Sequence, residues 1–213
     1  MRAVQQLRPG LVAVPAFLDL CDPDLTAAAA ALRAEYGVDE AVVLPLLFTE
    51  AFHATVDTPT AVLKAQEETG MRLHPGAILG TGDEVLDALQ DCAGRAHIAV
   101  HEAILLLAVG SSSSTANEAV LALADRWSDH RVGPVWAGFA TSGEPKAKDV
   151  LRTAGASGRR VGIVPLFVAP GLLLDAVAQQ AMAIDAKVAQ PLGTALAELV
   201  LQRYDEALVG VAG

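Results

Sequence analysis

The feature that most constrains the fold of this chain is a match of the sequence to itself. Three short segments recur later in the chain, in the same order and at an offset that shrinks slowly. The matched pairs are residues 17–23 with 139–145, 45–48 with 165–168, and 79–81 with 192–194. A shrinking offset is expected when the second copy has shorter loops. The chain therefore reads as two copies of one unit, which we place at residues 1–98 and 99–213.

Both copies alternate apolar runs with alanine-rich helical stretches. We expect strands at 11–17, 40–48, 71–74, 102–109, 134–140, 160–168 and 187–189, and helices at 24–36, 59–68, 83–93, 115–127, 145–154, 172–183 and 194–208. The run at 40–48 has no polar alternation, which is typical of a strand buried on both faces. This alternation predicts an α/β fold with parallel sheets and right-handed crossovers. We therefore expect two tandem flavodoxin-like α/β lobes.

The first copy lacks an element that opens the second. The counterpart of the strand at 102–109 would lie before Met1, so the first lobe is expected to lack its first strand. Either the true start lies upstream, or the protein does without this strand. Its loss would make the next two strands pair directly or recruit a strand from elsewhere. It would also expose sheet edges, which favours a homodimer that covers them.

Composition narrows the class of protein. Of 213 residues, 53% are hydrophobic, but no apolar run approaches the roughly 20 residues that span a bilayer. We expect no membrane segment, no leader and a cytoplasmic location, with both cysteines reduced. The net charge of −10 disfavours nucleic acid as a partner, because phosphate binding needs a basic face.

Two residues that could carry chemistry follow neighbouring strands of the first copy. His53 comes after the run at 40–48, and Asp19 comes after the strand at 11–17. The carboxyl ends of parallel strands meet at one edge of a sheet, so these side chains are expected to lie close together. An imidazole with a carboxylate suits divalent first-row metals. Taken singly, each has a simpler interpretation, as a loop histidine and a helix-capping carboxylate. The second copy has Leu173 and Thr141 at these places.

Other polar residues are weaker candidates. Glu50 lies close to His53 in the chain and is interpreted as a solvated loop residue. The remaining histidines lack ligand-like spacing and are expected to be structural or exposed. The serine run at 111–114 could donate backbone N–H groups to an anion, although a flexible turn explains it as well.

The segment from Pro45 through His53 to Pro59 resembles the "PLFL…GxHxxxDIP" signature of the sirohydrochlorin chelatases of CbiX type. Ala51 stands at the signature's glycine and Thr58 at its isoleucine. Residues 17–23 look like that family's "FLE…P" segment, residues 79–80 its later "LG" turn, and residues 110–117 its opening "GHGSR…N" segment. The resemblance covers nearly the whole chain.

The resemblance implies insertion of a divalent metal, Co²⁺ or Fe²⁺ (Ni²⁺ in some members), into the acidic tetrapyrrole sirohydrochlorin. It implies two active-site histidines and a carboxylate. His53 matches the second histidine, and Asp19 takes the carboxylate position. The place of the first histidine falls before Met1, and the matching residue of the second copy is Val109. The metal is then a substrate, and no cofactor is bound permanently.

We therefore interpret the chain as a chelatase of cobalamin or sirohaem synthesis, with residues 99–213 as a degenerate repeat. Two alternatives stay open. One is a degenerate homologue that binds a tetrapyrrole or a metal without catalysis. The other is a non-catalytic, two-lobed protein that binds a small molecule.

Overall fold

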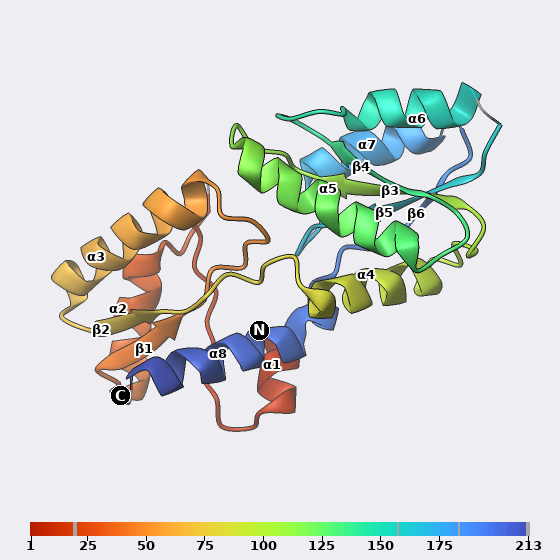
Figure 1. Cartoon of the computed structure of the whole chain (residues 1–213). Coiled ribbons are helices and arrows are strands. Elements are labelled where there is room, and N and C mark those ends of the chain that lie inside the picture. The colour runs from red at the N-terminus through yellow and green to blue at the C-terminus, as the bar shows by residue number, and fades with distance from the viewer. Residues whose placement is uncertain (19–20, 157, 183, 212–213) are drawn as a thin grey trace. The chain divides into compact units, whose positions relative to one another are not determined.

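The computed structural model describes residues 1–18, 21–156, 158–182 and 184–211. The chain divides into two compact units (Figure 1). Unit 1 comprises Met1–Leu79 and Ala197–Gly213, and unit 2 comprises Gly80–Leu196. Each unit contains a parallel sheet with helices packed on it, as the alternation of strands and helices predicts.

Unit 2 is built on a four-stranded sheet in the order β4-β3-β5-β6. Its strands are β3 (Ala103–Ala108), β4 (Val135–Phe139), β5 (Val161–Pro165) and β6 (Lys187–Val188). All three ladders are parallel, and β3 lies between β4 and β5, pairing Leu105 with Trp136 on one side and Ile163 on the other. The strand that opens the second copy is therefore the central strand of this sheet.

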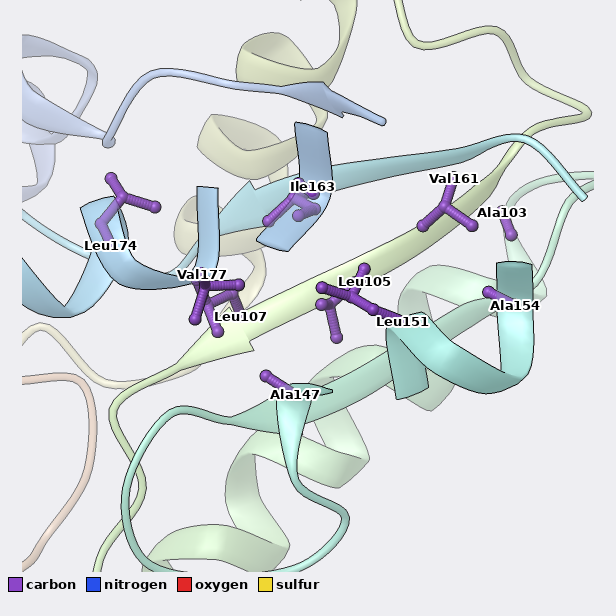
Figure 2. Packing of buried hydrophobic residues seen from close by; sticks show 11 residues of the cluster. Ala103, Leu105, Leu107, Ala147, Leu151, Ala154, Val161, Ile163, Leu174 and Val177 are labelled. Carbon is purple, nitrogen blue, oxygen red and sulfur yellow. The ribbon is translucent and has the colours of Figure 1, made fainter. Parts of the chain in front are cut away.

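Helices cover both faces of the unit 2 sheet. They are α4 (Asp83–Arg95), α5 (Ser114–Asp129), α6 (Ala147–Ala156) and α7 (Leu172–Met182), with a short 3₁₀ turn, η2 (Gly193–Leu196). Figure 2 shows Leu105 and Leu107 of β3 facing Leu151 of α6 and Val177 of α7. Alternate residues of β3 point to the opposite face, and every residue of β3 is buried.

Unit 1 has a two-stranded parallel sheet, in which β1 (Glu40–Val43) pairs with β2 (Arg72–Pro75). Its helices are α1 (Arg2–Leu7), α2 (Leu25–Tyr36), α3 (Thr58–Thr69) and α8 (Ala197–Val211). Ala29, Val62 and Leu73 belong to the apolar core that α2 and α3 form with the strands. In Figure 1 the strands lie between α2–α3 and α8, which contacts both strands. Val4 of α1 packs on α8.

Local signals in the sequence place the helix ends correctly. Asp24 accepts a hydrogen bond from the Ala27 backbone N–H at 2.7 Å and so caps α2. Gly37 and Gly70 follow α2 and α3 with φ of 66° and 68°, a left-handed conformation that glycine adopts at little cost.

The internal repeat is confirmed in atomic detail. The Phe17 N–H donates to Pro23 O at 2.9 Å, and at the matched position Phe139 N–H donates to Pro145 O at 2.9 Å. Both segments contain a cis X–Pro bond at their prolines. The third matched pair also agrees, because the N–H of Leu79 and that of Leu192 bond the strand segments preceding them, at Leu47 and Phe167.

Two predicted strands of the first copy differ from the structure. Residues 11–16 form no regular secondary structure, and only an isolated bridge links Phe17 to Asp24. The strand predicted at 40–48 ends at Val43 and is half-buried, whereas its counterpart β5 is buried throughout. The reason is shared. In the described residues of unit 1 no strand occupies the place of β3, so neither segment has its inner pairing partner. Direct pairing of the two segments, or recruitment of another strand, does not occur there.

The boundaries of the two compact units differ from those of the two sequence repeats. Helix α4 belongs to the first repeat but packs in unit 2, where it contacts β5. Helix α8 belongs to the second repeat but packs in unit 1. The repeats thus exchange their last helices. In the part of the chain that the structure describes, no helix is both long and apolar enough to cross a membrane.

Candidate functional site

His53 begins a π-helical turn, η1 (His53–Asp57), that leads directly into α3. Such turns are rare and are frequently found at functional sites. The turn follows β1 through the loop at 44–52, as expected for the carboxyl edge of the sheet. The His53 side chain is 57% exposed, and the neighbouring Phe52 and Val56 are also exposed. An imidazole therefore stands on an accessible, partly apolar surface.

Asp57 is the hydrogen-bond partner of His53. The distance between His53 Nδ1 and Asp57 Oδ2 is 2.6 Å. An ionised carboxylate can only accept, so Nδ1 donates this bond. Among the described residues none bonds Nε2, and in a neutral imidazole with a hydrogen on Nδ1 this atom carries the free lone pair. The pair can therefore present Nε2 to a metal ion or to a proton.

The turn is closed by Thr58. Both the backbone N–H and the side-chain hydroxyl of Thr58 donate to the carbonyl oxygen of His53, the hydroxyl at 2.7 Å. Thr58 is buried, with 6% of its surface exposed. The main chain of His53 is thus tied to Thr58, the buried first residue of α3.

A hollow of about 250 Å³ lies beside this turn in unit 1, and Asp57 is on its wall. Residues of the first matched segment, of α2 and of α3 line it. They are Phe17, Leu18, Asp24, Leu25, Thr26, Asp57, Thr60, Ala61 and Lys64. Phe17, Leu18 and Asp57 therefore border the same hollow of unit 1.

The predicted partner Asp19 lies outside the described residues, so its place beside His53 stays a prediction. Glu50 is exposed in the loop before η1. Within the described ranges, no group of three or more His, Cys, Asp or Glu side chains is arranged to hold a metal ion. The described part of the candidate site is thus the pair of His53 and Asp57.

His74 also has a charged partner in unit 1, but it is not part of this candidate site. His74 Nε2 lies 3.3 Å from Glu40 Oε2, at the start of β1 rather than beyond its end. Hydrogen bonds from His74 and Arg72 lower the pKa of Glu40. This cluster bridges β1 and β2. His97, His101 and His130 are exposed in unit 2, as expected.

The matching positions of unit 2 carry no ionisable pair. Leu173 of α7 stands where His53 does, and it is 40% exposed. The Thr141 hydroxyl, at the position of Asp19, donates to the Val109 carbonyl at 2.8 Å. The serine turn is also closed on itself, because the Ser111 N–H donates to Asn117 Oδ1 and the Asn117 side-chain amide donates to the Ser111 carbonyl oxygen. At these positions unit 2 thus offers no imidazole or carboxylate, and the degeneracy of the second copy stays a prediction.

Asp57 is the site residue that sequence reasoning did not single out. A signal was present, because residues four apart on a helical turn face the same way, and His53 and Asp57 have this spacing. Sequence reasoning expected a loop between the strand and the helix, and in a loop residues four apart need not face the same way.

Comparison with known proteins identifies the family. The model of the CbiX family matches residues 1–96 and 103–207. The chain belongs to the CbiX family. No protein of curated function matches it significantly in sequence.

Solved structures share the fold of this CbiX-family chain. SirB from Bacillus subtilis with Fe³⁺ is 20% identical, with a TM-score of 0.78 over 97% of this chain and 87% of that one. SirB from Bacillus subtilis subspecies spizizenii, a sirohydrochlorin chelatase in complex with cobalt, has a TM-score of 0.74 at 20% identity, over 97% and 86%. CbiX, the terminal enzyme of siroheme biosynthesis in denitrifying bacteria, has a TM-score of 0.56 at 20% identity, over 84% and 81%.

Proposed function

We propose that this CbiX-family protein is a chelatase that inserts Co²⁺ or Fe²⁺ into sirohydrochlorin, in cobalamin or sirohaem synthesis. The observation that carries the proposal is the exposed imidazole of His53, whose Nδ1 bonds Asp57 and whose Nε2 is open among the described residues. It lies in the segment that resembles the chelatase signature. Family membership and the fold shared with SirB support the same activity.

The chemistry of insertion matches this group. Two pyrrole N–H protons must leave the macrocycle as the metal enters. A neutral imidazole can accept a proton or hold the metal over the ring, and a carboxylate can relay protons or complete the coordination. We assign the first role to His53 and the second to Asp19. Metal and tetrapyrrole are both substrates in this scheme, and no cofactor stays bound.

The residues of the candidate site do not by themselves select one metal. Sites of imidazole and carboxylate discriminate poorly among divalent first-row ions, so supply in the cell would decide between Co²⁺ and Fe²⁺. The SirB structures with iron and with cobalt support both ions. The cytoplasmic location and the homodimer stay predictions.

The decisive experiment follows the absorbance of sirohydrochlorin with Co²⁺ in the presence and absence of the protein. We expect insertion faster than the non-enzymatic rate and a large loss of this acceleration in His53→Ala. The variant Asp19→Ala tests the proposed acidic partner in the same assay. His101→Ala is the matched control, because His101 is an exposed histidine of unit 2.

The outcomes separate the alternatives. Binding of sirohydrochlorin without acceleration would identify a degenerate homologue and contradict the catalytic proposal. Absence of any binding would leave only the non-catalytic protein that binds another small molecule.

A further inference from the structure

His53 is hydrogen-bonded to two neighbours in the chain, through its side chain to Asp57 and through its main chain to Thr58. We infer that Asp57 and Thr58 form a clamp that positions His53, with Asp57 setting the imidazole tautomer and Thr58 fixing the main chain. The proposal rests on the proposed function for its kinetic consequence, but not for its structural one. Asp57 and Thr58 are positioning residues here, because they act through His53.

The side-chain half of the clamp is the bond to Asp57. With Nδ1 at 2.6 Å from the Asp57 carboxylate, the hydrogen of a neutral ring is held on Nδ1, and Nε2 is left as an acceptor. Without this carboxylate, the hydrogen can sit on either nitrogen. The ring would then spend part of its time with Nε2 blocked. Carboxylates that orient a metal-handling histidine in this way commonly change affinity or activity about 10–100-fold when removed.

The main-chain half is the pair of bonds from Thr58. An exposed histidine at the start of a helix would be free to fray with its turn. Here the His53 carbonyl accepts both from the Thr58 N–H and from the Thr58 hydroxyl at 2.7 Å, and Thr58 is buried. Two donors on one carbonyl oxygen hold the π-turn closed. Closing the turn keeps residues 53 and 57 on one face, which the bond between their side chains requires.

Thr58 makes the clamp a property of this chain. The signature that the segment resembles has isoleucine at this place, which could fill the same buried space but could not donate a hydrogen bond. We therefore assign the hydroxyl to holding the turn and not to filling the core. In agreement with this, the hydroxyl donates its hydrogen bond to the carbonyl oxygen of His53.

The test reads the tautomer of His53 by ¹⁵N NMR of the full-length protein, at a pH where the ring is neutral. The His53→Ala spectrum assigns the signal. We expect the wild type to carry its hydrogen on Nδ1, Asp57→Ala to lose this preference, and Thr58→Val to lose part of it. Thr58→Ser should restore it. Thr153→Val is the control, because the Thr153 hydroxyl makes the same kind of bond, to Asp149 O at 2.9 Å, on helix α6 of unit 2.

The kinetic arm uses the sirohydrochlorin assay with Co²⁺. We expect Asp57→Ala to lower kcat about 10–100-fold with little change in KM, and Thr58→Val to lower it less. A wild-type ring with its hydrogen on Nε2, or a tautomer unchanged in Asp57→Ala, would overturn the inference. A protein that shows the expected tautomers but no insertion would instead contradict the proposed function and leave the clamp in place.

Discussion

At the scale of single residues, Glu102 of unit 2 is a buried carboxylate that needs hydrogen-bond donors around it. Its side chain is 4% exposed, and its carboxylate accepts from Lys187 Nζ at 2.9 Å and from the Ala99 N–H at 2.7 Å. The hydrogen bond from Lys187 holds the pKa of Glu102 below its usual value, against the opposing effect of burial. These bonds join the segment before β3 to the edge strand β6.

Glu102 predicts how stability depends on pH. Because its pKa is lower in the folded than in the unfolded protein, its contribution is complete above the ordinary value of 4.5 and is lost as the pH falls through the folded-state pKa. Glu102→Gln should therefore lower the free energy of unfolding by about 1–3 kcal/mol at pH 7. The loss should shrink below pH 4. Urea unfolding at several pH values measures this, and an equal loss at all of them would contradict it.

Sequence reasoning at this scale succeeded where a residue acts on its near neighbours. The predicted helix at 24–36 agrees with α2, and Asp24 and Gly37 at its two ends make local capping contacts. Asp57 was missed although its signal was equally local, because the turn that gives the spacing its meaning was expected to be a loop. The π-helical form depends on the anchor at Thr58, which only the structure shows.

At the scale of elements, β4 approaches both β3 and α6 closely at Gly138. A methyl group placed there would lie 2.6 Å from Leu105 Cδ1 and 3.0 Å from the Ala147 backbone of α6. The absence of a side chain therefore allows α6 to pack directly on the sheet.

A pair of substitutions tests this packing. Gly138→Ala should destabilise the protein by about 1–3 kcal/mol, because the backbone of α6 must move. Gly94→Ala is the matched change in α4, where no atom lies within 4 Å of the added methyl group, and it should stabilise by about 0.5–1 kcal/mol. Thermal unfolding of both variants gives the comparison. Equal effects in the two would show that the close approach at Gly138 is not limiting.

The elements of unit 2 were predicted more accurately than those of unit 1. The strand predicted at 102–109 is β3, with only its ends trimmed. The segment at 11–17 has a similar apolar pattern but is no strand, since a strand exists only where a partner supplies its hydrogen bonds. In the described residues of unit 1, that partner is absent.

At the scale of the whole molecule, the exchange of α4 and α8 determines which parts of the chain can fold together. The apolar face of α4, with Val85 and Leu89 fully buried, belongs to unit 2. Ile98, which follows α4, packs on Gly162 of β5, where a methyl group would lie 2.5 Å from Ile98 Cδ1. A unit cut at the repeat boundary loses both.

This predicts the behaviour of fragments. Residues 80–196 should fold alone and unfold cooperatively, because they keep α4 and Ile98. Residues 99–213, cut at the repeat boundary, should be much less stable and should expose the face of β5 that these groups cover. Circular dichroism with urea titration compares the two. Greater stability of the 99–213 fragment would show that the repeats, not the compact units, are the folding units.

The sequence by itself determined the repeat, the alternation of strands and helices, the helix ends and the candidate histidine. Each of these depends on residues a few positions apart, or on a comparison of the chain with itself. Only the tertiary structure decided which segments became strands, which unit each last helix joined and which side chain His53 bonds. These depend on partners that are distant in sequence or on the exact form of a turn. A hydrophobic pattern shows that a surface must be buried, but it does not name the surface that covers it.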